Sequence, residues 1–285
     1  MTRQAPAKIN LSLRILGRRE DGFHEISTRM AALQLADELT FTLDGPAGSM
    51  AFSCSDPTVP ADASNLVVKA AHLLQQARGP LPGVKIHLQK NIPHSAGLGG
   101  GSSDAATTLL ALNDLCQLGQ TPAGLHTLAA SIGSDIPFFL TSGMADCTGR
   151  GEIIAPVSSP IPDWPILLIK LPFAVPTPWA YQQWRTSLEI PSIDYAPQTL
   201  DDQTLVNDLE RPVFQKHFIL AHLKQWLRQQ PGVRAALMSG SGSTLFAILH
   251  SSDPLPALTK GIHEIAGEEI WLQPTRLAGG NVVLR

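Results

Sequence analysis

This sequence is poor in cysteine and has no long apolar runs. Its 285 residues include three cysteines, which are far apart and lack metal-binding spacing: Cys54, Cys116 and Cys147. Such a set excludes a disulfide framework and a cysteine-held zinc site, and it favours a reducing, cytoplasmic environment. No apolar run approaches the roughly 18 to 20 residues that span a bilayer, and the first residues contain no continuous apolar core. We therefore expect no membrane segment and no signal peptide.

Charge is also scarce, at 16% of residues, and it is balanced: 21 Lys and Arg against 24 Asp and Glu give a net charge of −3. No basic cluster is present, which excludes nucleic acid as a partner because phosphate backbones require clustered Lys and Arg. The hydrophobic share of 44% can supply the cores of one large or two medium domains. No repeat or heptad pattern points to an assembly, so a monomer and a homodimer are both compatible with the sequence.

What the chain does have is a glycine-rich segment at residues 93–106, with the sequence Pro-His-Ser-Ala-Gly-Leu-Gly-Gly-Gly-Ser-Ser-Asp-Ala-Ala. Glycine has no Cβ, so its backbone adopts positive φ readily and can direct several N–H groups at one anion. An alternating strand, residues 84–88, comes before the segment. An Ala/Leu-rich helix, residues 105–115, comes after it, and we expect Ser102, Ser103 and Asp104 to cap that helix. This order predicts a phosphate-binding loop; the alternative is a flexible loop without a ligand.

Three common phosphate motifs do not fit this segment. A Walker loop requires Lys after its last glycine, and a dinucleotide fingerprint requires glycine where Ser102 stands. The catalytic loop and the Asp-Phe-Gly sequence of protein kinases are absent from the chain. We therefore expect a different nucleotide-binding design.

Residues 7–15 alternate between apolar and polar side chains, which predicts a strand. Lys8 and Asn10 then share one face, about 6.5 to 7 Å apart, which suits two groups that touch one small substrate. The alternative is that this face is solvated and takes no part in binding.

A polar turn is expected at residues 17–25, where Phe23 offers a stacking face and His24 a hydrogen-bonding edge. A nucleobase uses this combination, whereas the alternative is a hairpin with one buried aromatic residue. Asp135 follows a helix that Thr121 and Pro122 start and Gly133 ends. An aspartate there is either a general base or a cap for neighbouring amides.

From about residue 157 the chain becomes rich in proline, which marks the expected domain boundary. An apolar strand at residues 166–171 and helical runs at residues 213–228 follow. The small-residue turn Ser-Gly-Ser-Gly-Ser, residues 239–243, precedes a strand at residues 244–249. Such a turn can lie against a ligand or the glycine loop, or it can be a tight connection without a ligand.

Taken together, these motifs resemble those of the GHMP small-molecule kinases and occur in the same order. The resemblance spans nearly the whole chain and rests on residues 6–11, 19–25, 93–106, 133–139, 149–152, 176–178, 207–210 and 238–243. It implies an α+β fold of two domains with the active site in the cleft between them. Residues 1–156 would form the ATP-binding domain. Residues 157–285 would form a ferredoxin-like C-terminal domain that contributes to the substrate site.

Within the family, residues 6–10 and the Phe23–His24 turn resemble the member that phosphorylates the 2-hydroxyl of a cytidine diphosphate derivative, a small-molecule substrate. The resemblance implies ATP as the donor and Mg²⁺ as a second cofactor. Asp135 is then the general base, and Lys8 favours its ionised form. Two alternatives stay open: a kinase of the homoserine or mevalonate type, and a catalytically silent nucleotide-binding regulator. The joint presence of Lys8 and Asp135 argues against the regulator.

The resemblance assigns the other site residues to two ligands. The nucleotide contacts it implies are Asn65, Lys90, Pro93, Ala96, Gly97, Leu98, Gly99, Gly100, Gly101, Ser102 and Ser103. The acceptor contacts are Asn10, Phe23, His24, Thr177 and Tyr181, with Phe23 and Tyr181 enclosing the cytosine and His24 reading its edge. Relatives often have tyrosine where Phe23 stands, so here the ring is kept without the hydroxyl. No dedicated metal site is expected, because ATP, water and the loop serines can hold Mg²⁺.

Overall fold

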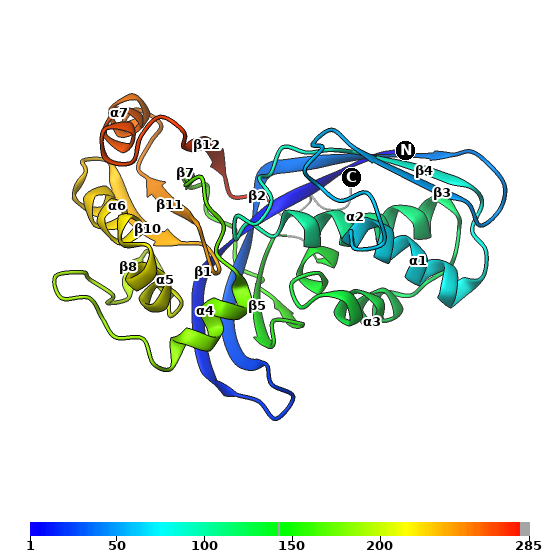
Figure 1. The fold of residues 1–285 in the computed structure, drawn as a ribbon, viewed down its shortest axis with the longest axis horizontal. Coiled ribbons are helices and arrows are strands. Elements are labelled where there is room, and N and C mark those ends of the chain that lie inside the picture. Colours follow the sequence, from blue (N-terminus) through cyan, green and yellow to red (C-terminus); the bar gives the residue numbers. More distant parts are fainter. Residues whose placement is uncertain (142, 280–285) are drawn as a thin grey trace.

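Two long antiparallel strands run through the molecule and connect its two halves (Figure 1). They are β1 (Thr2–Arg18) and β2 (His24–Leu43), and the predicted polar turn joins them. This computed structural model describes residues 1–141 and 143–279. Because both strands extend well beyond one lobe, a residue on β1 can lie near elements from either half.

The larger sheet has eight strands and belongs mostly to the first half of the chain. Its order is β3-β4-β2-β1-β9-β8, and β5 pairs with both β2 and β6. The remaining bounds are β3 (Met50–Cys54), β4 (Val84–Gln89), β5 (Met144–Gly149), β6 (Ile153–Pro156), β8 (Gln198–Leu200) and β9 (Gln203–Asn207). Strand β9 lies parallel to β1, so a segment from the second half completes this sheet.

Helices pack on the larger sheet (Figure 1). They are α1 (Leu66–Arg78), α2 (Gly100–Leu115) and α3 (Pro122–Ile132), with a short 3₁₀ turn, η1, at Pro137–Leu140. Their apolar side chains form one core with those of the sheet, including the fully buried Phe41, Leu109 and Phe139. This core fixes the position of α2, and the glycine loop leads directly into that helix.

The smaller sheet has four antiparallel strands in the order β10-β11-β7-β12. The bounds are β7 (Pro165–Lys170), α4 (Thr177–Trp184), α5 (Glu210–Lys216), α6 (Phe218–Gln229), β10 (Val233–Met238), β11 (Thr244–Leu249), α7 (Leu255–Ala266) and β12 (Trp271–Arg276). With α6 and α7 the strands follow the β-α-β-β-α-β order of ferredoxin-like folds. Of the helices in the described part of the chain, none has both the length and the apolar character needed to cross a membrane.

Local side-chain and glycine chemistry sets the ends of several elements. Asn65 caps α1 by accepting a hydrogen bond from Val67 N–H, and Gly79 ends that helix with a positive φ of 89°. Thr121 caps α3 in the same way, and Gly133 ends it, as predicted. Strand β11 has the predicted bounds. In each of these cases the determining residues lie within the element or next to it.

The predicted start of α2 is wrong. The helix begins at Gly100 rather than near Ala105, and Gly99 is its N-cap with a left-handed φ of 69° and no side-chain capping bond. Ser102, Ser103 and Asp104 therefore lie inside the first turns and cap nothing. The glycine at position 100 permits a close approach, because a Cβ there would lie 3.0 Å from Lys90 Nζ. The unpaired amides of the first turn thus belong to the glycine loop itself.

Candidate active site

Two cavities share part of their walls. Their volumes are about 420 Å³ and about 460 Å³. Four residues line both: Ile26, Asp135, Thr177 and Tyr181. Two ligands seated in these cavities would therefore meet beside Asp135.

The glycine loop forms one wall of the first cavity. The predicted nucleotide contacts that line it are Pro93, Ala96, Gly97, Gly99, Gly100, Gly101 and Ser102. Leu98 and Ser103 do not line it, because both side chains are buried within the protein (1% and 0% exposed). The Leu98 carbonyl instead accepts a hydrogen bond from Lys8 N–H at 2.9 Å. This contact ties the loop to strand β1.

Only glycine fits two positions of this loop. Gly97 and Gly99 have positive φ angles of 78° and 69°. A Cβ at Gly97 would lie 2.3 Å from the carbonyl oxygen of Ser239, and one at Gly99 would lie 2.9 Å from Phe139 Cζ. The hydroxyl of Ser239 also donates a hydrogen bond to the Gly97 carbonyl at 3.0 Å. The turn at residues 239–243 therefore lies against the glycine loop, as one of its predicted placements has it.

Lys8 is buried and directed at Asp135. Its Nζ lies 3.5 Å from Asp135 Oδ2, and it donates a hydrogen bond to Asn10 Oδ1 at 2.6 Å. Asn10 in turn donates to Thr28 Oγ1 at 2.8 Å. The Lys8 side chain is 4% exposed and that of Asp135 36%. The alternative of a solvated outer face for Lys8 is thus wrong, and a fixed cation stands beside an accessible carboxylate.

Asn65 and Lys90 also line the first cavity, but their polar groups already have partners. Asn65 Oδ1 accepts from Val67 N–H at 2.8 Å. Lys90 Nζ lies between the carboxylates of Asp37 and Asp104, 3.1 Å from Asp104 Oδ2. Burial raises the pKa of Asp104 to about 8, and Lys90 opposes this rise. Lys90 therefore holds two buried carboxylates together at the base of the glycine loop.

Aromatic residues line the second cavity. The imidazole of His24 stacks on the Tyr181 ring, with centroids 5.3 Å apart. Phe23 is 52% exposed, and the Arg150 guanidinium lies 4.9 Å from the centre of its ring. Tyr181 belongs to helix α4. All three predicted clamp residues thus converge on one cavity, although the pair in contact is His24 with Tyr181.

Burial affects the protonation of two of these rings. It lowers the pKa of His24, and nearby Arg18 adds to the effect, so the imidazole is neutral near pH 7. Burial also raises the pKa of Tyr181, with a contribution from Asp135, so its phenol stays protonated. A neutral imidazole offers one donor and one acceptor, which suits the edge of an uncharged base.

Several residues that line the cavities were not among the contacts predicted from the sequence. Arg150 lines the second, and Asp104, Gly240 and Ser241 line the first. A cation between two glycines, as in the Gly-Arg-Gly-Glu turn at residues 149–152, was a usable signal for Arg150. For Gly240 and Ser241 the signal was the small-residue turn itself, which the sequence predicts can lie against a ligand or the glycine loop, although that loop lies over a hundred positions away along the chain.

Within residues 1–141 and 143–279, no group of three or more His, Cys, Asp or Glu side chains could hold a metal ion. The site consists of a cavity lined by the glycine-loop backbone, a lysine–aspartate pair and a cavity lined by aromatic residues. Such a set is suited to bringing two substrates together and accepting a proton from one of them.

Comparison with known proteins gives the class of this one. Residues 65–147 match the GHMP kinases N terminal domain, and residues 198–264 match GHMP kinases C terminal. Together these matches cover more than half of the chain. The chain belongs to the GHMP kinase family.

Its similar relatives narrow the class further. A protein of Methylacidiphilum infernorum (isolate V4) named 4-diphosphocytidyl-2-C-methyl-D-erythritol kinase is 46% identical over 251 residues, which cover 88% of this chain and 86% of the relative. A crystal structure of 4-(cytidine 5'-diphospho)-2C-methyl-D-erythritol kinase matches with a TM-score of 0.77 and 34% identity, covering 98% of this chain and 100% of the other. The homoserine kinase from Cytophaga hutchinsonii ATCC 33406 matches with a TM-score of 0.67 and 18% identity, covering 98% of this chain and 95% of the other. That last likeness concerns the fold alone.

Proposed function

We propose that this protein transfers the γ-phosphoryl group of ATP to the 2-hydroxyl of 4-diphosphocytidyl-2-C-methyl-D-erythritol, within the non-mevalonate route to isoprenoid precursors. One observation carries the proposal: a glycine-loop cavity and an aromatic cavity share Asp135. Relatives at 46% and 34% identity bear the name of this kinase. A donor nucleotide and an acceptor nucleotide derivative each have a cavity of suitable character, and their reacting ends would meet at the shared wall.

Asp135 acts as the general base in this proposal. It accepts the proton of the 2-hydroxyl while that oxygen forms a bond to the γ-phosphorus, and the bond to the β,γ-bridging oxygen breaks as ADP leaves. Lys8, 3.5 Å from Asp135 Oδ2, offsets negative charge around the attacking oxygen. Phosphoryl transfer asks for little covalent chemistry from the protein. Most of the acceleration then comes from alignment and from the loop amides that face the phosphates.

Three aromatic rings hold the cytosine in the second cavity. Phe23 and Tyr181 supply flat faces for stacking, and neutral His24 supplies hydrogen bonds to the base edge. Arg150 lines the same cavity, and its guanidinium can pair with the diphosphate of the acceptor. Thr177, which lines both cavities, contacts the acceptor nearer its reacting hydroxyl, and Asn10 does so from the first cavity beside Lys8.

Mg²⁺ is the second cofactor in this proposal, and the donor set fits it. The ion prefers oxygen ligands, usually substrate phosphates and waters with one or two protein groups. The Ser102 hydroxyl lines the first cavity, and Asp104 Oδ1 there is buried without a hydrogen-bond partner in the described chain. The Ser102 hydroxyl and the Asp104 carboxylate would hold the ion, whose positive charge would favour the ionised form of Asp104 against the effect of its burial. The ion would neutralise charge on the phosphates. The cytoplasmic location and the choice between monomer and homodimer stay predictions from the sequence.

The proposal is tested by coupled ADP release from purified protein with ATP and Mg²⁺. The acceptors are 4-diphosphocytidyl-2-C-methyl-D-erythritol, homoserine, mevalonate and galactose, each in a separate assay. Turnover with the cytidyl substrate alone is expected. Turnover with another acceptor would instead favour the homoserine or mevalonate type of kinase, and no acceptor-dependent turnover would favour the silent regulator.

The aromatic cavity also predicts the effect of removing a ring. Tyr181→Ala should raise the KM for the cytidyl acceptor about 5- to 150-fold, because stacking on a base contributes about 1 to 3 kcal/mol. The KM for ATP should stay near its original value. Tyr181→Phe is the matched control, since it keeps the stacking face and loses only the hydroxyl.

Cytidine monophosphate should compete with the acceptor and not with ATP in the wild type, and its inhibition constant should rise with the acceptor KM in Tyr181→Ala. Steady-state kinetics with both substrates varied measures all of these quantities. An acceptor KM that is unchanged in Tyr181→Ala would remove this ring from cytosine binding.

A further inference from the structure

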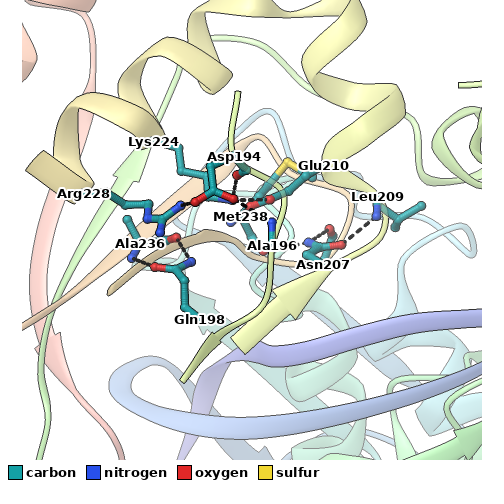
Figure 2. Close-up of polar contacts among 11 residues, drawn as sticks. Asp194, Ala196, Gln198, Asn207, Leu209, Glu210, Lys224, Arg228, Ala236 and Met238 are labelled. Atoms are coloured by element: carbon teal, nitrogen blue, oxygen red, sulfur yellow. Dashed lines mark hydrogen bonds and ion pairs between the residues drawn. The ribbon is translucent and has the colours of Figure 1, made fainter. Parts of the chain in front are cut away.

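Three side chains outside the cavities bind strand β10 and the turn that follows it (Figure 2). Asn207 Nδ2 donates hydrogen bonds to the carbonyls of Met238, at 2.7 Å, and Gly240, at 2.8 Å. Glu210 Oε1 accepts one from Met238 N–H at 2.9 Å. Gln198 exchanges two hydrogen bonds with the backbone of Ala236, two residues before the end of the strand. Asn207 and Glu210 thus bind the backbone where the strand passes into the turn, and Gln198 binds it two residues earlier, within the strand.

That turn, residues 239–243, contacts three separate parts of the active site. The Ser239 hydroxyl donates to the Gly97 carbonyl of the glycine loop at 3.0 Å. The Ser241 hydroxyl lies 2.8 Å from Thr177 Oγ1 at the start of helix α4. Gly240 faces strand β1, since a Cβ there would lie 3.5 Å from Lys8 Nζ. The position of the turn therefore sets the spacing between the loop, the acceptor helix and the catalytic strand.

The groups that hold the turn are buried and polar, and two of them form an ion pair. Asn207 is 4% exposed, and Glu210 and Lys224 are each 2% exposed. Lys224 Nζ lies 2.5 Å from Glu210 Oε2, which leaves Glu210 Oε1 to accept the Met238 N–H. Asn207 Oδ1 also accepts from Leu209 N–H at 2.9 Å, so the amide cannot rotate without losing bonds. Apolar side chains of similar volume can stabilise a core as well as a buried ion pair does. These positions are polar because their side chains hold the backbone of Met238 and Gly240 in place.

We propose that Asn207, supported by the Glu210–Lys224 pair, is a positioning residue for phosphoryl transfer. It acts through the turn at residues 239–243 and touches neither substrate. By fixing the Met238 and Gly240 carbonyls it holds the glycine loop and helix α4 at the spacing that the transfer requires. This inference rests on the proposed function, because the reaction is what that spacing serves.

Asn207→Asp tests the proposal, with Gln198→Glu as a matched control. Each variant replaces an amide donor by a carboxylate oxygen that faces the backbone of β10, and side-chain size is kept. Asn207→Asp puts that oxygen against the carbonyls of Met238 and Gly240, whereas Gln198→Glu puts it against that of Ala236. Urea unfolding should show a loss of stability in both variants. The kcat should fall about 10- to 100-fold in Asn207→Asp, the effect of a misplacement of about 1 Å, and stay close to the wild-type value in Gln198→Glu.

Hydrogen exchange supplies a readout that does not depend on turnover. Peptides covering residues 238–244 should exchange faster in Asn207→Asp than in Gln198→Glu, and affinity for a fluorescent ATP analogue should fall in Asn207→Asp only. Equal kcat in the two variants, or unchanged exchange at the turn in Asn207→Asp, would overturn the proposal.

A second variant, and a readout that needs no turnover, keep the test decisive. If Asn207→Asp does not fold, Glu210→Gln makes the same comparison, since it weakens the Lys224 pair that supports the Met238 contact. A wild-type protein without turnover would instead contradict the proposed function. In that case nucleotide affinity and hydrogen exchange in the variants would still decide whether Asn207 positions the turn.

Discussion

Replacing Asp135 with Asn lowers kcat about 10²- to 10⁴-fold, the contribution expected of a positioned general base. Asparagine has the same size, but its amide cannot take the proton of the acceptor hydroxyl. The variant should fold normally, because the Asp135 side chain is 36% exposed and lies at the wall between two cavities rather than in a core. Both ligands should still bind, since the glycine loop and the aromatic rings are unchanged.

Asp146→Asn is the matched control for this experiment. Asp146 also pairs with a cation, Arg29, at 2.7 Å, and is 49% exposed, but it lines neither of the two active-site cavities. The kcat of this control should stay near the wild-type value. Initial rates give kcat, and calorimetric titration gives the affinity for ATP and acceptor. If Asp135→Asn kept more than about a tenth of the wild-type kcat, Asp135 could not be the base.

Gly97→Ala should abolish measurable ATP binding. A Cβ at this position would lie 2.3 Å from the Ser239 carbonyl oxygen and 3.1 Å from that of Gly242, so backbone would have to move. The φ of 78° adds strain that a residue with a side chain tolerates poorly. Because the glycine loop and the 239–243 turn pack backbone to backbone, the loop would leave its phosphate-binding shape.

Gly79→Ala separates the two causes of this effect. Gly79 ends helix α1 with a φ of 89°, but a Cβ there would meet nothing within 4 Å. This control should lose about 1 to 2 kcal/mol of stability from backbone strain alone and keep its ATP affinity. Isothermal titration with ATP, together with thermal unfolding, distinguishes the variants. Wild-type affinity in Gly97→Ala would mean that the loop does not bind the phosphates.

Features that depend on neighbouring residues could be predicted from the sequence. The start of α3 at Thr121, its end at Gly133 and the bounds of strand β11 all follow from local side-chain chemistry. The glycine loop was recognisable for the same reason, because the residue type alone shows where the backbone can adopt positive φ. Lys8 and Asn10 were correctly placed on one face, which their hydrogen bond confirms.

Features that depend on distant contacts could not be predicted. The start of α2 at Gly100 places Lys90 against the first turn, where a Cβ on Gly100 would lie 3.0 Å from Lys90 Nζ, and no local pattern reveals that contact. Likewise, the stacking of His24 on Tyr181 joins residues from β2 and α4. The hydrogen bonds from Asn207 to the turn cross from one sheet to the other. The active site is assembled from such contacts. The sequence therefore indicated which residues form the site, but not which of them contact one another.

The most direct test of phosphoryl transfer to the 2-hydroxyl is phosphorus NMR of the reaction products. Purified protein is incubated with ATP, Mg²⁺ and carbon-labelled 4-diphosphocytidyl-2-C-methyl-D-erythritol. The coupling between phosphorus and the labelled carbons then shows which hydroxyl carries the new phosphate. The account predicts a new phosphomonoester on carbon 2, an intact cytidine diphosphate linkage and an equal amount of ADP. A phosphate on another hydroxyl, cleavage of the diphosphate linkage, or ADP formed without a new phosphomonoester would contradict it.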